Sequence, residues 1–233
     1  MTVRRIGVAV VLITSAVAFY VSVVRSWMLN WGATEAEVRG VLPGESVVAI
    51  PRYQSRRAIP INAPVEEVWG WLVQIGQGRG GFYSYDWLEN LFGLNIHSTD
   101  QILPELQHLG VGDFIAAEPN QVAGWRVTAL DPPRSLVLTV SIEDAGLPDD
   151  SRLDSEAFSG VWIFQLNPID NSSCRLLVDF RADFGPGPLS AALSALLLEP
   201  VHFIMERKML IGIKKRAERN CEESAVAGRP GAA

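Results

Sequence analysis

The sequence CRLLVDFRADFGPGPLSAALSALLLEPVHFIMERKMLIGIKKRAER spans residues 174–219, and its periodicity changes part of the way along. Cys174–Phe184 is rich in apolar residues and predicts a strand, which the GPGP of residues 185–188 ends. Residues 189–219 predict one long helix of roughly 45 Å at about 1.5 Å per residue, and Pro200 is where a kink is expected. The first half of this helix is almost entirely apolar, so it has to pack against another element.

The residues before this stretch predict more strands and two short helices. Pro64, Glu66 and Glu67 are typical of a helix start, and a second helix is expected over residues 84–92. The acidic residues 143–156 predict a loop. Because strands follow one another without alternating helices, we expect an α+β fold in which the long helix covers an antiparallel sheet. Strands are expected at residues 53–61, 114–117, 124–130, 135–142, 158–166 and 174–184.

Composition fits one folded domain of ordinary polarity. The 233 residues are 48% apolar and 20% charged, with a net charge of −6. We divide the chain into an N-terminal segment (1–30), a linker (31–52), the domain (53–220) and a disordered tail (221–233). The acidic balance and the lack of a basic patch argue against nucleic acid as a partner. Cys174 and Cys221 are expected to be free thiols, and neither a metal site nor a cofactor is expected.

Residues 6–24 form an uncharged run of 19 residues, preceded by Arg4 and Arg5. Two interpretations stay open: a single-pass membrane helix, which the length favours, and a signal peptide cleaved near residues 16–18. Both place the domain outside the cytoplasm, because positive charge is slightly heavier before the run. Trp27 and Trp31 follow it and suit either an interfacial aromatic belt or packing against the domain.

Several stretches carry a resemblance to a known superfamily: WGAT at 31–34, IPINAP at 59–64, the long run at 71–90, residues 104–113 and MERKML at 205–210. Together with the element order they resemble the START-like, or SRPBCC, superfamily of polyketide cyclases and plant-allergen-type ligand binders. More narrowly, they look like a bacterial subgroup with an N-terminal hydrophobic segment. The resemblance implies the helix-grip fold, in which a curved sheet grips a long C-terminal helix around a cavity closed by two short helices. It does not decide a reaction, because the superfamily hosts many functions.

The glycines of residues 76–81 match GxGxxG, but a helix precedes them where a dinucleotide site needs a strand. They are therefore interpreted as a tight turn between two helices. Arg79 within this turn suits a ligand carboxylate or phosphate, or else an ion pair with Asp86 or Glu89.

Further candidates are aromatic or titratable. The run of aromatic residues at 82–87 suits either a pocket mouth or core packing. His202 and Glu206 share a helix face and form either a proton-handling pair or a solvated pair. Glu199 lies in apolar surroundings and faces a similar choice. The predicted ligand-binding residues are Arg79, Tyr83, Tyr85, Trp125, Trp162, His202 and Glu206.

The leading functional hypothesis is a binding module, tethered at the membrane, for a hydrophobic or amphipathic molecule that is lipid-like or polyketide-like. A cyclase or hydrolase is the enzymatic alternative. It would use His202, Glu206, Arg79 or Tyr83 as acid, base or oxyanion donor, and it predicts that several of these residues converge in one pocket. The third hypothesis is a structural or interaction protein whose cavity is filled by its own side chains.

Overall fold

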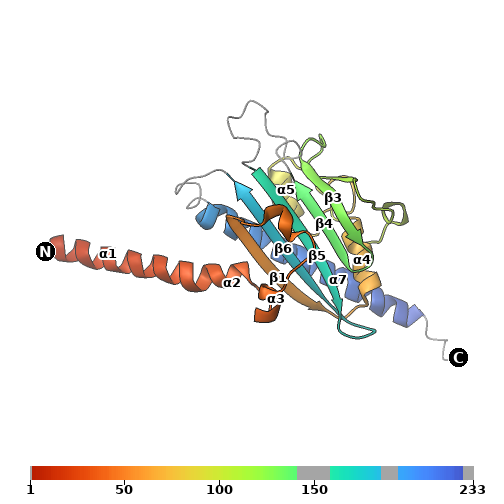
Figure 1. Cartoon of the computed structure of the whole chain (residues 1–233), viewed down its shortest axis with the longest axis horizontal. Coiled ribbons are helices and arrows are strands. Elements are labelled where there is room, and N and C mark those ends of the chain that lie inside the picture. Colours follow the sequence, from red (N-terminus) through yellow and green to blue (C-terminus); the bar gives the residue numbers. More distant parts are fainter. Residues whose placement is uncertain (1, 141–157, 185–193, 228–233) are drawn as a thin grey trace.

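The protein is described here from a computed structural model, in residues 2–140, 158–184 and 194–227. In these residues six strands form one sheet with all neighbours antiparallel, in the order β1-β6-β5-β4-β3-β2 (Figure 1). The first strand pairs with the last along its whole length, so one edge of the sheet is made by strands distant in sequence. The strands are β1 (Tyr53–Ile61), β2 (Phe114–Ala116), β3 (Gly124–Asp131), β4 (Ser135–Val140), β5 (Phe158–Pro168) and β6 (Cys174–Phe184).

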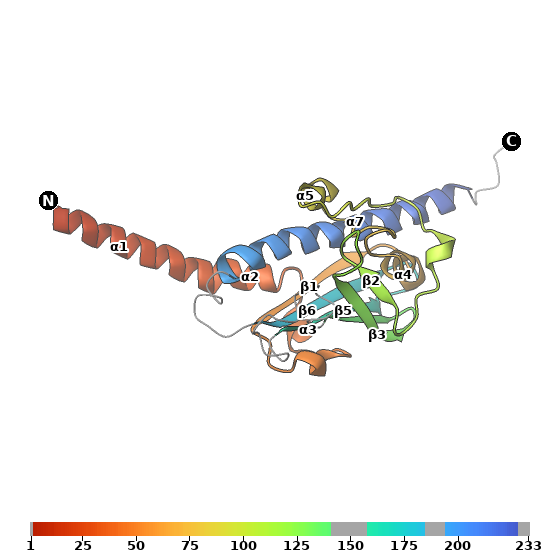
Figure 2. The ribbon, with the colours of Figure 1, turned by 90° about the horizontal axis from the view of Figure 1, so that it is seen from above.

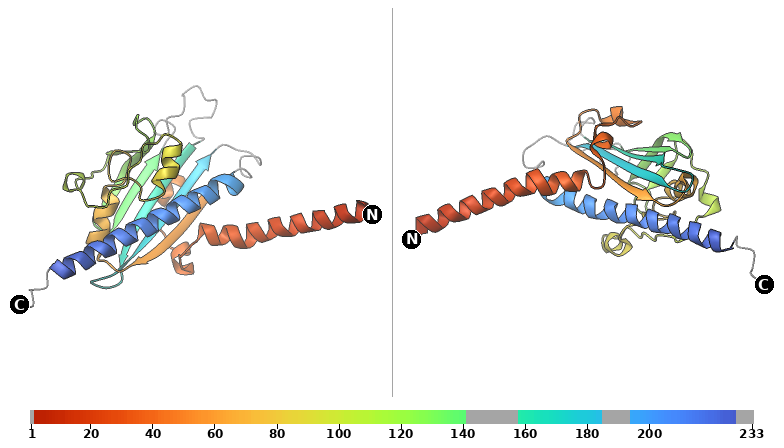
Figure 3. Two further views of the ribbon diagram at one scale, coloured as in Figure 1. Left: turned by 180° about the vertical axis from the view of Figure 1, so that it is seen from behind. Right: turned by 90° about the horizontal axis from the view of Figure 1, so that it is seen from below.

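The C-terminal helix α7 (Glu199–Ala227) lies along one face of this sheet (Figures 2 and 3). It buries Met209, Leu210, Ile213 and Ala217, whose three- and four-residue spacing places them on one side of the helix. A π-helical turn, η4 (Ser194–Leu198), runs directly into it, and Pro200, which has no backbone N–H to donate, follows as the second residue of α7. The helix continues past Arg219, where its end was expected, to Ala227.

Alternation along β5 shows how both faces of the sheet are covered. Trp162 and Phe164 belong to the core beneath α7, whereas Val161 and Ile163 belong to a smaller cluster on the opposite face. That opposite face is covered by residues before the first strand, including α3 (Glu35–Arg39) and η2 (Glu45–Val48). Val48 packs there, and Thr34 caps α3 in a capping box with Glu37, as the sequence indicates.

Charged side chains also bind this covering segment to the sheet. Arg56 on β1 is ion-paired with Asp179 on β6 at 2.7 Å and with Glu45 of η2. Arg181 bridges the same two carboxylates at 2.8 Å each. All of these side chains are largely buried, so the network fixes η2 on the sheet.

Two short helices lie between β1 and β2: α4 (Val65–Val73) and α5 (Asp86–Leu91), followed by the 3-10 turn η3 (Pro104–Leu106). α4 buries Trp71 and Leu72 and packs on α7. Figure 2 shows α5 on the same side of the sheet as α7. The chain passes very close to α7 just before α5: a Cβ added at Gly212 would lie 2.3 Å from the carbonyl oxygen of Tyr83. This position therefore requires glycine.

The N-terminal expectation is corrected by the structure. No helix in the described residues is long and apolar enough to cross a membrane. The uncharged run at 6–24 is divided, because α1 (Thr2–Phe19) gives way to a π-helical segment, η1 (Tyr20–Arg25), before the short α2 (Ser26–Leu29). Predicting a single-pass membrane protein was therefore wrong.

The end of this N-terminal segment is attached to the start of α7, while α1 extends away from the sheet (Figure 1). Arg25 forms an ion pair of 2.7 Å with Glu199, and the hydroxyl of Tyr20 donates to the carbonyl of Ala195. The rings of Trp27 and Trp31 both pack against Phe203, with centroids 5.2 and 6.5 Å away. For these two tryptophans the packing interpretation is confirmed.

The predicted α+β class and the antiparallel sheet under a long C-terminal helix are confirmed. Every predicted strand and both short helices are present within a few residues of their expected limits, as far as the structure describes them. The predicted loop at 143–156 and the predicted break at 185–188 lie outside the described residues. The four-part division of the chain stays a prediction. Cys174 and Cys221 are free, as expected.

Candidate functional site

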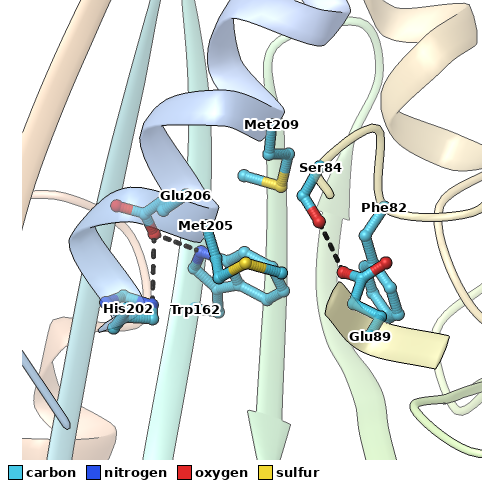
Figure 4. Close-up of a pocket in the computed structure, with 8 residues that line it drawn as sticks. All are labelled: Phe82, Ser84, Glu89, Trp162, His202, Met205, Glu206 and Met209. Carbon is cyan, nitrogen blue, oxygen red and sulfur yellow. Dashed lines mark hydrogen bonds and ion pairs between the residues drawn. The ribbon is translucent and has the colours of Figure 1, made fainter. Parts of the chain in front are cut away.

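A cavity of about 90 Å³ lies between α7, the α5 region and the sheet (Figure 4). Most of the space between sheet and helix is filled by side chains, among them the fully buried Trp71, Tyr83 and Phe164. The cavity is what remains beside the first half of α7. Its lining is largely apolar, with acidic and hydroxyl groups at two places. The lining residues are Phe82, Ser84, Glu89, Trp162, His202, Met205, Glu206 and Met209.

Glu206 forms one polar wall of the cavity, and its two oxygens are both engaged. The Arg57 guanidinium pairs with Oε2, and the indole of Trp162 donates to Oε1 at 3.0 Å. The Arg57 and Glu206 side chains are 0% and 1% exposed, so the pair is enclosed by protein. Arg57 also donates to the carbonyl of Met28. Glu206 is therefore held as a paired carboxylate by the protein itself.

His202 lies one helical turn before Glu206, with its Nε2 3.6 Å from Glu206 Oε1. The Tyr53 hydroxyl lies 2.7 Å from Nδ1, and an Arg57 N–H lies 3.3 Å from the same atom. Because arginine only donates, we assign Nδ1 as the acceptor and the ring proton to Nε2. Burial lowers the pKa of His202 to about 4, and Arg57 adds to this lowering while Glu206 opposes it. The imidazole is thus neutral at physiological pH.

Glu89 forms the opposite polar wall, and it differs from Glu206 in having no cation beside it in the described structure. The hydroxyl of Ser84 donates to Oε1. Oε2 is buried and has no hydrogen-bond partner among the described residues. Burial raises the pKa of Glu89, the charge of Asp86 raises it further, and the Ser84 hydrogen bond opposes both. Two carboxyl groups of unlike environment therefore face the same cavity.

Aromatic rings form the floor of the site along the sheet. Trp162 lies roughly parallel to Phe82, with ring centroids 6.5 Å apart and planes at 29°. Trp125 packs behind it at 5.4 Å, and Phe180 contacts both Trp125 and His202. These contacts fix the rings in place, so the floor is rigid and apolar.

The structure brings three of the predicted site residues to the cavity and leaves four away from its lining. Trp162, His202 and Glu206 line it, whereas Trp125 packs behind Trp162. Arg79 donates to the carbonyls of Ile75, Val73 and Leu106 and so caps the end of α4, with no ligand role evident from these contacts.

Tyr83 and Tyr85 also point elsewhere. Tyr83 is buried, its hydroxyl donates to the carbonyl of Trp71, and it accepts from the amide of Gln74. Tyr85 lies beneath the ammonium of Lys208, 5.5 Å from the ring centroid. Of the four residues named in the cyclase or hydrolase hypothesis, His202 and Glu206 meet at the cavity, whereas Arg79 and Tyr83 are occupied by structural contacts elsewhere. Ligand contact by any predicted residue stays a prediction.

Glu89, Ser84 and the two methionines of α7 were missed by sequence reasoning. Glu89 sits in a short helix, where an acidic residue is usually solvated, and only the structure shows that it is buried and lines a cavity shared with Met205 and Met209. The glycines at 76–81 form a tight turn closed by a bridge between Gly76 and Gly81, in agreement with the turn interpretation. Glu199 is buried and paired with Arg25, away from the cavity.

No family model and no curated protein matches this chain in sequence. Among solved structures the chain is similar to a polyketide_cyc-like protein from Corynebacterium glutamicum: 16% identity over 73% of this chain and 94% of that one, with a TM-score of 0.35. A norcoclaurine synthase point mutant from Thalictrum flavum, in complex with a transition-state analogue, is 12% identical over 72% and 96%, with a TM-score of 0.39. A protein from Nitrosospira multiformis is 12% identical over 73% and 99%, with a TM-score of 0.43.

These likenesses have TM-scores below 0.5 and carry no argument about function. The fold assignment rests on the strand order and on the position of α7 across the sheet. The strand order and the long C-terminal helix agree with the helix-grip fold that the expected resemblance implies, whereas membership of the START-like, or SRPBCC, superfamily stays a prediction. The narrower subgroup stays a prediction.

Proposed function

We propose that this protein binds a small, mostly apolar molecule in the cavity between α7, the α5 region and the sheet. The observation that carries this proposal is the cavity itself: apolar walls from Trp162, Met205 and Met209, with polar groups at two opposite places. Binding sites for small molecules commonly combine an apolar lining with a few convergent polar groups. Methionine suits such a lining because its flexible side chain adapts to the shape of a ligand.

The size of the cavity limits what it binds. At about 90 Å³ it is smaller than the engineered cavity of about 150 Å³ that takes benzene, and well below the roughly 300–1,000 Å³ of drug-sized sites. A long-chain lipid does not fit this space. The cavity is open on one side, so a compact ring about as large as benzene would fill it and extend into this opening. The proposed ligand is therefore a molecule of about five or six heavy atoms in a ring, and neither a lipid nor a large polyketide is part of the proposal.

The test compares two neighbouring positions on α7. Met205 lines the cavity, whereas Ile204 is 49% exposed on the other side of the helix. Met205→Trp should fill the cavity and abolish binding of cyclopentanone, used as a probe, while Ile204→Trp should leave binding unchanged. Binding to the full chain is followed by isothermal titration calorimetry.

Native mass spectrometry of the purified wild-type protein adds a second reading, because a small molecule carried through purification should be missing from Met205→Trp. Equal probe affinity in the wild type and both tryptophan variants would contradict the proposed location. The absence of any binding to the wild type would contradict the function.

A further inference from the structure

Resting on the binding function proposed above, we propose that Glu89 selects the ligand, by donating a hydrogen bond from its free carboxyl oxygen to an uncharged acceptor oxygen, as in a ketone or ether. This assigns a ligand class as well as a site residue: compact molecules with an apolar body and one neutral oxygen. Nothing in the sequence pattern marks Glu89 for this role.

The geometry of Glu89 supplies the first argument. The residue is 8% exposed and lines the cavity, with its carboxyl group between Ser84 and Phe82 (Figure 4). Its Oε2 has no partner in the described structure, although the large majority of buried polar side-chain atoms are hydrogen-bonded. Rotation about the last side-chain bond is soft, so the carboxyl group turns toward a ligand easily. Because Oε2 is itself shielded from solvent, this rotation is what would bring the unpaired oxygen to the cavity and to a ligand.

The chemistry of the surrounding groups fixes the direction of the hydrogen bond. Ser84 donates to Oε1, and in the described residues no ion pair to Glu89 is found, so nothing nearby compensates a negative charge. Burial and the neighbouring Asp86 both raise the pKa of Glu89 and favour its neutral form. In the neutral form, with Oε1 accepting from Ser84, the acid proton would be on Oε2. Oε2 would then donate a hydrogen bond, and a ligand oxygen would be its acceptor.

The other polar wall does not compete for the ligand. Glu206 has both oxygens engaged by Arg57 and Trp162, and Nδ1 of His202 accepts from Tyr53. An anionic ligand would bring a second negative charge beside Glu206 in a cavity of low polarity, which is unfavourable. A neutral ligand that accepts a hydrogen bond from Glu89 brings no second charge into the cavity and needs no hydrogen bond from Glu206 or His202.

The test uses three probes of similar size with the full chain: cyclopentanone with an acceptor oxygen, cyclopentane without one, and cyclopentylamine as a cation. They are titrated into wild type, Glu89→Gln, Glu89→Met and, as a control, the exposed Glu105→Met. Glutamine keeps an N–H donor, whereas methionine keeps the length without one. Dissociation constants are read from the ¹³C-methyl NMR signals of Met205 and Met209.

We expect the wild type, Glu89→Gln and Glu105→Met to prefer cyclopentanone over cyclopentane. Glu89→Met should lose about three- to tenfold of that preference, the usual worth of one neutral hydrogen bond. Isotope-edited infrared spectroscopy of the wild type should show the carbonyl band of a protonated carboxyl group shifting when cyclopentanone binds, and no such shift in Glu89→Gln.

Equal binding of the ketone and the hydrocarbon by wild type would overturn the role of Glu89 and leave the binding function standing. Tighter binding of cyclopentylamine would overturn the neutral ligand class and identify an ionised Glu89. If none of the probes moves the Met205 and Met209 signals, the proposed function fails, and this inference fails with it.

Discussion

Replacing Arg57 by methionine should destabilise the protein by about 3–5 kcal/mol, because it leaves Glu206 buried without its cation. The two side chains are 0% and 1% exposed, so water cannot replace the lost partner. Arg57 also donates to the carbonyl of Met28 and to the hydroxyl of Tyr53, so the replacement removes one donor from each of these oxygens. Urea unfolding of the full chain, followed by circular dichroism, measures the change in the free energy of unfolding.

The double variant Arg57→Met/Glu206→Gln sharpens this test. Glutamine is neutral and still accepts from the indole of Trp162, so the hydrogen bonds from Arg57 to Met28, Tyr53 and His202 stay broken. Its cost should be about 1–3 kcal/mol, less than that of Arg57→Met alone and far less than the sum of the two single changes.

Arg39→Met is the matched control, because the Arg39–Glu35 pair is 73% and 86% exposed and should be worth less than about 1 kcal/mol. The reasoning is refuted if Arg57→Met costs no more than Arg39→Met. It is also refuted if the double variant costs the sum of the single variants.

Three further outcomes are expected. Gly212→Ala should lower the free energy of unfolding in urea by about 1–3 kcal/mol, because its Cβ would lie 2.3 Å from the Tyr83 carbonyl oxygen. Gly7→Ala, where the added Cβ meets no heavy atom within 4 Å, should leave stability unchanged or raise it. Equal effects of the two changes would contradict this packing. Burial raises the pKa of Glu89 above 4.5, so the contribution of this residue to stability is complete below about pH 4.5 and is lost as the pH rises through its folded-state pKa. Glu89→Gln should therefore be more stable than wild type at about pH 7, and this difference should disappear toward about pH 4. A difference in stability that does not depend on pH would contradict the raised pKa. Burial lowers the pKa of His202 from 6.5 to about 4, so its contribution to stability is present above about pH 6.5 and is lost as the pH falls toward 4. His202→Gln should therefore flatten the dependence of the free energy of unfolding on pH in that range. The same pH dependence in wild type and variant would contradict the lowered pKa.

The strands and helices were predictable because their signals are local. Cys174–Phe184 has strand composition and is bounded by turn residues, and Thr34 begins a helix through the capping box that its neighbours allow. The long helix was recognisable from its apolar first half. The π-helical turns at η1 and η4 were not, because nothing in the residue types distinguishes them from an α-helix.

The candidate site was only partly predictable, because its polar groups gain their roles from distant partners. His202 and Glu206 share a helix face, which sequence reveals, but Arg57, about 150 positions earlier in the chain, decides that Glu206 is a paired carboxylate. Glu89 resembles a surface residue in the sequence, and only the fold shows that it is buried at the cavity beside residues of α7. The membrane prediction rested on the length of the uncharged run at 6–24, and in the structure this run is divided between α1 and η1, with no described helix long and apolar enough to span a membrane.

The most direct test of the central claim is a ¹³C-methyl NMR titration of the full chain with cyclopentanone, using methionine labels. Met205 and Met209 line the cavity, whereas Met28 is buried at α2, outside its lining, and serves as an internal control. We predict saturable shifts of the Met205 and Met209 signals with Met28 unmoved. Equal small shifts of all three signals, or none, would contradict a ligand site between α7 and the sheet.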